Sequence, residues 1–338
     1  MMDNIIREDL EKIKGTVKGD AFDAKRVLVT GGAGFIGSWL CDALLGFGAN
    51  VTAVDDLSTG RLKNIDHLNE KAAFEFVKSD ICSFKSKEKF DFIFHMAGHA
   101  SPDEYQTHPI ETLQTSASGS FAMAELARKN HATLLFASTS EVYGDSEVIP
   151  TPETYWGKVN PIGPRSCYDE GKRFAEALLI AYSKQYKLDV RIPRIFNTYG
   201  PRLREDGLYG RAMSRFILQA LTNQPITVYG DGKQTRSFCY ITDTVSALML
   251  LMISPKTNGE VVNVGNTREV TILELAKRVQ KTTNCRSNIE FHPLPKDDPK
   301  RRCPDISKLE LFIEWKTKVS FEKGLKRTIF WFLQSHSY

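Results

Sequence analysis

Apolar and polar positions between residues 26 and 195 follow two alternating periodicities. Short runs of consecutive apolar residues predict buried strands, and stretches with an apolar residue at every third or fourth position predict helices. The predicted strands are 26–30, 51–54, 74–77, 90–94, 133–137 and 190–195, and the clearest helices between them are 35–44, 111–129 and 169–186. Strands that alternate with helices indicate an α/β fold, a doubly wound parallel sheet with helices on both faces.

Two regions lie outside this alternation. Residues 1–24 carry apolar side chains at helical spacing that glycines then interrupt, which predicts an N-terminal helical extension. After Gly200 the alternation fades, and residues 293–304 are rich in proline and charge. Helices are still predicted at 212–222, 271–281 and 321–333. We interpret this part of the chain as a smaller, mixed α/β C-terminal lobe.

The composition narrows the class of protein. Of the 338 residues, 41% are apolar and 25% are charged, which is typical of a globular enzyme and excludes a disordered or fibrous chain. The 45 Lys and Arg against 41 Asp and Glu leave a net charge of +4, an excess too small to indicate nucleic-acid binding. No apolar run approaches the roughly 20 residues that cross a bilayer, so we expect no membrane segment.

The cysteines and histidines give no metal signal. The six cysteines are scattered and include no CxxC pair, which argues against a zinc site or a disulfide framework and favours a reducing compartment. No signal peptide or anchor is recognisable, so we expect a cytoplasmic protein. His95 and His99 lie four residues apart, but no carboxylate completes a metalloprotease motif, and we predict no metal site.

The string TGGAGFIGS follows the first predicted strand and opens a helix. It places Gly31, Gly34 and Gly37 at intervals of three, where glycines allow a tight turn and a close approach of the backbone to a pyrophosphate. The helix N-terminus adds unpaired N–H groups that favour negative charge. Together these features predict a dinucleotide-binding turn.

The end of the second predicted strand carries a carboxylate, Asp55, 18 residues after Gly37. A carboxylate there accepts hydrogen bonds from the adenosine ribose hydroxyls and repels a 2′-phosphate, so the sequence favours NAD over NADP. Arg61 and Lys63 lie close by in the sequence and leave the opposite preference open.

A tyrosine and a lysine lie four residues apart in the string YDEGK. Tyr168 and Lys172 share one face if this segment is helical. A nearby ammonium favours the phenolate of a tyrosine, whose pKa is otherwise about 10, and the pair therefore predicts a base that works near neutral pH. Upstream, the Ser/Thr-rich string STSEVYG (138–144) follows another predicted strand.

These motifs together resemble the extended short-chain dehydrogenases/reductases that act on nucleotide sugars. Within that superfamily, about residues 26–330 are similar to the UDP-glucuronate decarboxylases, also called UDP-xylose synthases. The resemblance rests on TSEVYGD, YWGKVNPIGPRSCYDEGKR (155–173), RIFNTYGPR (194–202), QPITVYGDGKQTRSFCYI (224–241) and RCPDI (302–306). The run at 155–173 is the most specific of these, because the glycine turn and the YxxxK pair are shared across the superfamily.

Position 140 separates related activities. The similar sugar 4,6-dehydratases carry Thr-Asp-Glu where this chain has Thr139, Ser140 and Glu141, and their Asp helps to expel the C6 hydroxyl. Serine is a poor general acid for that step, whereas a substrate with a C6 carboxylate has no such hydroxyl to lose. The resemblance and this position imply NAD-dependent decarboxylation of UDP-glucuronate to UDP-xylose through a 4-keto intermediate.

The resemblance also implies the site. Tyr168 would be the base at the sugar 4-hydroxyl, Thr139 would orient that hydroxyl, and Lys172 would hold the nicotinamide ribose. Ser140, Glu141 and Arg236 complete the implied catalytic set. The implied cofactor residues are Gly31, Gly34, Phe35, Ile36, Gly37, Asp55, Asp80, Ile81, Ala97, Tyr168 and Lys172, and the implied substrate residues are Tyr105, Asn197, Tyr229, Arg236 and Arg302. Ordinary strand packing of Tyr229 and a solvated charge run at 300–302 are alternatives to two of these roles.

The same resemblance implies how the chain is divided and what it binds. Residues 25–198 and 237–265 would form an NAD-binding Rossmann domain, and residues 199–236 and 266–338 a nucleotide-sugar-binding lobe. We expect a UDP-sugar substrate and a homodimer built from the predicted helices 111–129 and 169–186. We expect no nucleic-acid or membrane partner.

Three residues depart from the decarboxylase pattern. Ser116 and Arg215 stand where that family usually has Asn, and His99 where it usually has Pro; the 202–211 loop is also about two residues longer. These positions lie near the expected ligands and leave the substrate open. The alternatives are an oxidative decarboxylase that releases the ketopentose and NADH, a 4,6-dehydratase, a 4-epimerase, and a non-catalytic protein that binds a nucleotide sugar or NAD.

Overall fold

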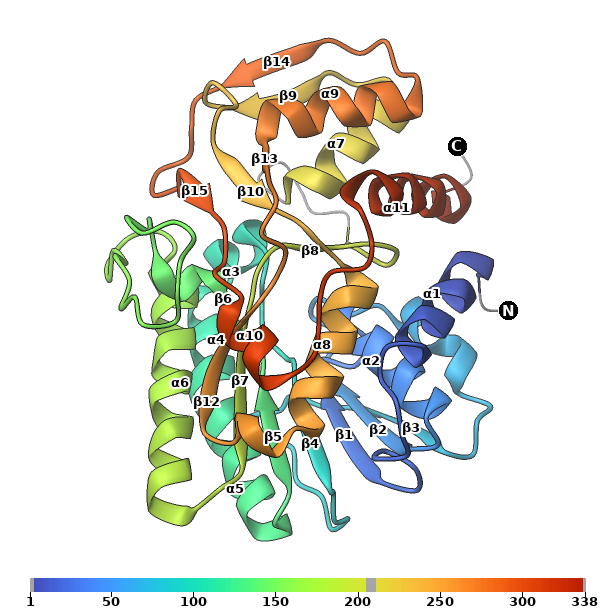
Figure 1. The fold of residues 1–338 in the computed structure, drawn as a ribbon, viewed down its shortest axis with the longest axis vertical. Coiled ribbons are helices and arrows are strands. Elements are labelled where there is room, and N and C mark those ends of the chain that lie inside the picture. The colour runs from blue at the N-terminus through green and yellow to red at the C-terminus, as the bar shows by residue number, and fades with distance from the viewer. Residues whose placement is uncertain (1–2, 205–210, 337–338) are drawn as a thin grey trace.

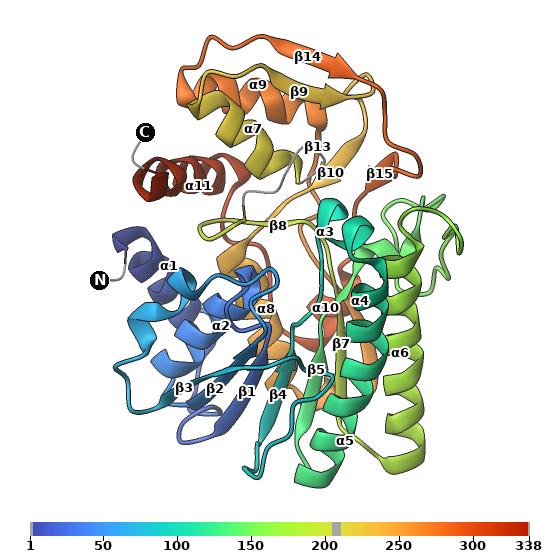
Figure 2. The ribbon, with the colours of Figure 1, turned by 180° about the vertical axis from the view of Figure 1, so that it is seen from behind.

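The computed structural model describes residues 3–204 and 211–336, and a parallel sheet of eight strands forms its core (Figures 1 and 2). Seven strands lie in the order β12, β7, β5, β4, β1, β2, β3, and β6 pairs with the end of β7. Their bounds are β1 Arg26–Thr30, β2 Asn50–Asp55, β3 Phe74–Lys78, β4 Phe92–His95, β5 Thr133–Phe136, β6 Ser138–Thr139, β7 Val190–Ile195 and β12 Glu260–Val264. All pairings are parallel, which confirms the predicted doubly wound α/β fold.

Different helices cover the two faces of the sheet, because successive side chains of a strand point to opposite sides. Val27 and Val29 belong to the apolar cluster that includes α2 (Phe35–Gly46) and α8 (Ile241–Ile253). Leu28, between them, belongs to the cluster on the other face, with side chains from α5 (Ser120–Asn130) and α6 (Ser166–Tyr186). The consecutive apolar residues of β1 are therefore buried on both sides, which is why the strand has no polar alternation.

The predicted helix 111–129 contains an interruption. It consists of α4 (Pro109–Gln114) and α5, joined by a π-helical turn at Thr115–Gly119. A Cβ on Gly119 would lie 2.4 Å from Cδ1 of Ile81, and a Cβ on Gly171 of α6 would lie 3.0 Å from the side chain of Ser116. The turn thus lies where this helix passes close to Ile81 and to α6.

The helix α8 has no amphipathic pattern, and the sequence did not predict it. Eleven of its residues are buried, since it lies between the sheet, α2 and the N-terminal helix. Periodicity distinguishes a helix only when one side of it faces water. Within residues 3–204 and 211–336, no helix combines the length and the apolar character that crossing a membrane would need.

The C-terminal part of the chain forms smaller mixed sheets above the carboxyl edge of the main sheet (Figure 1). β9 pairs in parallel with β14, and β10 pairs with β13 (antiparallel) and β15 (parallel), while β8 pairs with β11. The strand bounds are β8 Thr198–Tyr199, β9 Ile226–Tyr229, β10 Thr235–Ser237, β11 Cys239–Tyr240, β13 Glu269–Thr271, β14 Ile289–His292 and β15 Arg301–Arg302. The helices here are α7 Ala212–Leu221, α9 Ile272–Thr283, α10 Ser307–Phe312 and α11 Phe321–His336. Residues 205–210, the centre of the loop predicted to be longer than usual, lie outside the described residues.

The N-terminal helix α1 (Asn4–Lys14) packs against α2 and α8 and lies below α11 in Figure 1. Its apolar side chains join the main core, but its central contact is polar. Asp9 is fully buried, accepts a hydrogen bond of 2.6 Å from the hydroxyl of Tyr240, and pairs at 3.0 Å with Arg327 of α11. This carboxylate therefore joins the first helix of the chain to the last.

Replacing Asp9 by Ala should lower the free energy of unfolding by about 3 kcal/mol, because Arg327 and the Tyr240 hydroxyl lose a buried partner. Urea unfolding followed by circular dichroism measures the change. Glu8→Ala is the matched control, since Glu8 pairs with the same arginine but is exposed, and it should leave the unfolding midpoint nearly unchanged. Equal effects of the two variants would contradict this account of α1.

Candidate active site

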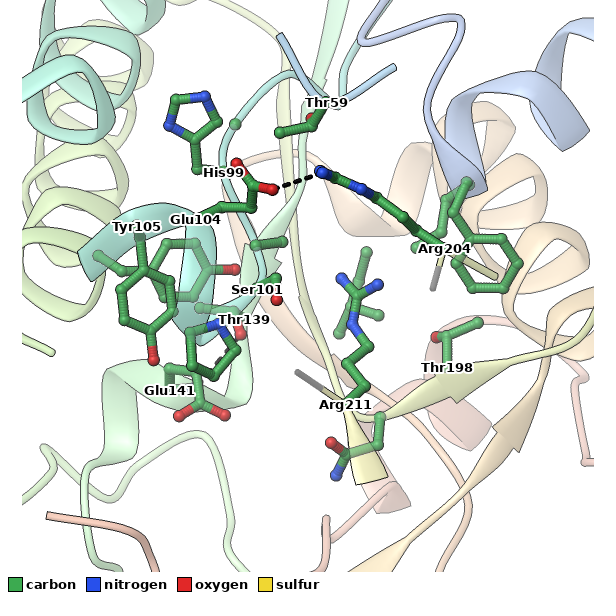
Figure 3. A pocket seen from close by; sticks show the side chains of 18 of the residues that line it. Thr59, His99, Ser101, Glu104, Tyr105, Thr139, Glu141, Thr198, Arg204 and Arg211 are labelled. Atoms are coloured by element: carbon green, nitrogen blue, oxygen red, sulfur yellow. Dashed lines mark hydrogen bonds and ion pairs between the residues drawn. The ribbon is translucent and has the colours of Figure 1, made fainter. Parts of the chain in front are cut away.

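A cavity of about 400 Å³ lies between the carboxyl edge of the main sheet and the C-terminal strands. Segments that follow β1 to β5 line one side of it, and residues of β9, β10 and β15 line the other; Figure 3 shows part of this cavity. Open α/β sheets bind ligands in this place. All of the predicted site residues line the cavity: Gly31, Gly34, Phe35, Ile36, Gly37, Asp55, Asp80, Ile81, Ala97, Tyr105, Thr139, Ser140, Glu141, Tyr168, Lys172, Asn197, Tyr229, Arg236 and Arg302.

The glycine turn between β1 and α2 leaves no room for side chains. Gly31 has a φ of +66°, and a Cβ on Gly37 would lie 2.0 Å from the Gly31 carbonyl oxygen. Gly34 precedes the first residue of α2 and caps its N-terminus without a side-chain hydrogen bond. The first N–H groups of α2 therefore face the cavity edge, where a diphosphate fits the turn and the helix dipole.

Asp55 lies at the end of β2, where its carboxylate accepts backbone hydrogen bonds from Ala33 (3.0 Å) and Leu57 (2.8 Å). A Cβ on Gly60 would lie 2.5 Å from this carboxylate, so the loop after β2 wraps closely around it. Burial raises the pKa of Asp55. Neither Arg61 nor Lys63, the residues that left NADP open, is among the cavity-lining residues. The surroundings of Asp55 thus fit an adenosine ribose without a 2′-phosphate.

Tyr168 and Lys172 share one face of α6, as their spacing predicted. The ring of Tyr168 stacks on that of Tyr105 with centroids 5.0 Å apart, and Lys172 Nζ donates a hydrogen bond of 2.8 Å to the Ala137 carbonyl. Burial raises the pKa of Tyr168 to about 12, although the Thr139 hydroxyl opposes this shift, and burial lowers the pKa of Lys172 to about 8. The predicted low pKa of Tyr168 is therefore wrong, because burial outweighs the hydrogen bond from Thr139 and the charge of Arg211.

Three arginines surround the carboxylate of Glu141. Arg165 pairs with it, Arg302 donates to it at 2.7 Å and also to the Ser140 carbonyl, and Arg236 lies close enough to act on its charge. Burial alone would raise the pKa of Glu141, but these arginines hold it below its usual range. The interpretation of 300–302 as a solvated charge run is wrong for Arg302, which is only 3% exposed.

Other cavity residues were not singled out from the sequence. Asp298 pairs with Arg236 at 3.0 Å, and Glu104 of α3 (Pro102–Thr107) pairs with Arg204 at 2.5 Å across the cavity (Figure 3). Arg211 also reaches the cavity, and its charge lowers the pKa of Tyr168. No local sequence motif pointed to these residues. Arg165 is different, because it belongs to the run at 155–173 on which the family resemblance rests.

Two of the three departures from the decarboxylase pattern line the cavity. The guanidinium of Arg215, in α7, lies over the ring of Tyr229, 4.7 Å from its centroid, and both side chains line the cavity. His99 bonds to Thr112 at 3.1 Å, and burial lowers the pKa of His99. Ser116 instead lies buried behind the cavity, against Gly171. Among the described residues, no three His, Cys, Asp or Glu side chains form a metal-binding group.

A doubly wound sheet, a glycine turn and a Tyr–Lys pair beside a threonine define a short-chain dehydrogenase/reductase. The model of the "NAD dependent epimerase/dehydratase family" matches residues 27–265, and the chain belongs to this family. It is 49% identical over 310 residues to UDP-glucuronic acid decarboxylase 1 of Danio rerio, covering 92% of this chain and 73% of that protein. The corresponding Xenopus tropicalis protein is 47% identical over 310 residues, covering 92% of this chain and 72% of that protein.

Solved structures resemble the whole architecture. The UDP-glucuronic acid 4-epimerase of Bacillus cereus, in complex with UDP-glucuronic acid and NAD, superposes with a TM-score of 0.82 at 29% sequence identity. The match covers 92% of this chain and 100% of that one. The comparison therefore extends to the C-terminal strands that close the cavity, beyond the residues of the family model.

Glu141→Gln should lower the free energy of unfolding by about 2 kcal/mol near neutral pH, because buried Arg302 loses its charged partner. The folded state lowers the pKa of Glu141, so its contribution is present above the unfolded carboxyl range and is lost as the pH falls toward the folded pKa. Urea unfolding should show the difference between wild type and variant shrinking from about pH 6 to about pH 3. The exposed Glu147→Gln serves as control, and a difference independent of pH would contradict the expectation.

Proposed function

We propose that this protein decarboxylates UDP-glucuronate to UDP-xylose and regenerates its NAD in each turnover. The proposal rests on the arrangement at 139–141, where the hydroxyl of Thr139, Ser140 and the arginine-bound carboxylate of Glu141 lie beside Tyr168. An acid that could expel a hydroxyl is missing from position 140, whereas the arginines suit a substrate with anionic groups at both ends. The relatives named UDP-glucuronic acid decarboxylases support the same reaction.

Tyr168 and Thr139 would act at the sugar 4-hydroxyl. NAD, when bound, supplies the acceptor for the C4 hydride and later returns that hydride. Tyr168 Oη takes the hydroxyl proton, and the hydrogen bond from Thr139 holds the phenol and the sugar oxygen in line. Because the pKa of Tyr168 is about 12, phenolate formation depends on positive charge in the cavity, which Arg211 supplies in part.

The oxidised sugar would then lose CO2 with little further help. Its carboxylate is β to the C4 ketone, so the electrons of the C5–C6 bond move into an enolate at C4. Tyr168, now protonated, donates a hydrogen bond to that enolate oxygen. C5 would take a proton from water, and Tyr168 would return its proton to the C4 oxygen when that carbon is reduced again. Glu141 would stay ionised throughout and hold Arg302 at the substrate, while Asp298 holds Arg236 there.

We further propose the chain division and assembly expected from the sequence. Residues 25–198 and 237–265 would bind NAD, and residues 199–236 and 266–338 the nucleotide sugar. Exposed apolar side chains on α4, α5 and α6 support a homodimer through these helices, since contiguous exposed apolar surface marks interfaces. They are Ile110, Leu113, Phe121, Phe174 and Tyr186. Six free cysteines agree with a cytoplasmic location.

The reaction is tested by incubating purified protein with UDP-glucuronate, with and without added NAD. We expect a UDP-pentose with loss of CO2 by mass spectrometry and no net absorbance of NADH. Tyr168→Phe should reduce turnover by roughly 100-fold or more, whereas Tyr186→Phe, on the exposed end of α6, should not.

Other products would identify the alternatives. A ketopentose with stoichiometric NADH would mean an oxidative decarboxylase, and a product that keeps its carboxylate would mean an epimerase. A dehydratase would release water instead of CO2. Binding of NAD without any turnover would contradict an enzymatic function.

The dimer is tested by Phe174→Glu, which introduces charge on the apolar surface of α6. We expect light scattering after size exclusion to give the mass of two chains for the wild type and one chain for the variant. Phe330→Glu is the matched control, because Phe330 is similarly exposed but lies on α11. A monomeric wild type, or dissociation by both variants, would overturn the assignment of the interface.

A further inference from the structure

The helix α6 presents three polar side chains to one short segment of the cavity wall, residues 137–139. They recur every four residues, so they lie above one another on the same face of the helix. Tyr168 shares a hydrogen bond with Thr139, and Lys172 donates to the Ala137 carbonyl at 2.8 Å. Glu176 accepts the hydroxyl hydrogen of Ser138 at 2.5 Å. Tyr168 and Lys172 have roles in the proposed reaction, whereas Glu176 has been given none.

Glu176 is held in place by an ion pair. Its side chain is 10% exposed and is bound by Arg194 of β7 through two hydrogen bonds, of 2.9 and 2.6 Å. Ser138 and Arg194 are directly paired in the β6–β7 ladder, and the Arg194 guanidinium lies 4.7 Å from the ring centroid of Tyr143. A bidentate ion pair of this kind has a fixed geometry. Ser138 is therefore held by a rigid acceptor.

The charge of Glu176 also reaches Lys172, one helical turn away. The groups that face the Lys172 ammonium are Glu176 and Tyr168 on α6, the Phe136 ring at 4.6 Å, and His95 of β4. Burial lowers the pKa of Lys172, and Glu176 opposes this shift. Burial also lowers the pKa of His95, to about 3, so this ring is neutral in the working range. Glu176 thus provides the negative charge that faces the ammonium.

We propose that Glu176 is a positioning residue of this site, which aligns Thr139 with Tyr168 through Ser138 and maintains Lys172 as an ammonium. The predicted effects on the reaction rate rest on the proposed function, whereas the contacts of Glu176 do not. A carboxylate meets both requirements at once, because it accepts from Ser138 and Arg194 and carries the charge. A neutral amide at this position would leave Arg194, whose side chain is only 13% exposed, without its counter-charge.

The test compares Glu176→Gln with Glu170→Gln, the same chemical change on a half-exposed residue of α6. Loss of the carboxylate should lower kcat roughly tenfold at neutral pH with KM nearly unchanged, because the reacting groups are misaligned after the substrate binds. The alkaline limb of the rate profile, where Lys172 loses its proton, should move to lower pH by about one pH unit. Glu170→Gln should retain the wild-type profile.

A second variant separates alignment from charge. Ser138→Ala removes the hydrogen bond but keeps both Glu176 and Arg194, so we expect a lower kcat with the alkaline limb unmoved. A purely structural role for Glu176 would lower stability and kcat without shifting the limb, and that result would overturn the proposal. If Glu176→Gln does not fold, an unchanged kcat in Ser138→Ala overturns the alignment step.

A measurement without substrate keeps this inference distinct from the proposed function. Lysine labelled at Cε with ¹³C reports the Lys172 titration by NMR, with Lys172→Arg identifying the signal. The pKa of Lys172, about 8 in the wild type, should be lower in Glu176→Gln and unchanged in Glu170→Gln. No UDP-pentose from the wild type would reject the proposed function while leaving this titration valid. An unshifted Lys172 signal would reject the charge effect of Glu176 even if the reaction is correct.

Discussion

The ion pair between Glu141 and Arg302 ties the two parts of the molecule together. Glu141 follows the end of β6 at the carboxyl edge of the main sheet, and Arg302 ends β15 among the C-terminal strands, 161 residues later. Arg165, just before α6, binds the same carboxylate. Buried charges are tolerated only when they are paired. This carboxylate therefore fixes how β15 lies against the end of β6, at one wall of the cavity.

The same pairing orders the cations of the cavity. Arg236 is fixed by Asp298, and Arg204 by Glu104, so the arginines that face a ligand are held in place by carboxylates of the protein. Such preorganised donors bind an anion without first losing side-chain freedom. Arg204 and Arg236 thus need little reorganisation to bind an anion.

Local signals in the sequence were sufficient for the sheet, the glycine turn and the Tyr–Lys pair. Strand runs and helical spacing depend on neighbours along the chain, and Gly31 or Gly37 is required by the turn itself. The helix α8 escaped prediction because it is buried all round and has no polar face. Arg211 and Asp298 escaped because only the fold brings them to the cavity. The pKa of Tyr168 was misjudged because burial, which depends on the whole structure, outweighs a nearby charge.

The pairing of β15 with β10 has a consequence for how the protein is made. A chain emerging from the ribosome can complete most of the main sheet by Ile195, but β12 and β15 come from far later in the sequence. Contacts between distant residues form slowly, since the intervening loop must first be closed. Until Arg302 has been synthesised, the nascent protein holds Glu141 beside an open pocket without its buried partner. The substrate side of the cavity is therefore complete only after β15, the last strand of the chain, has been made.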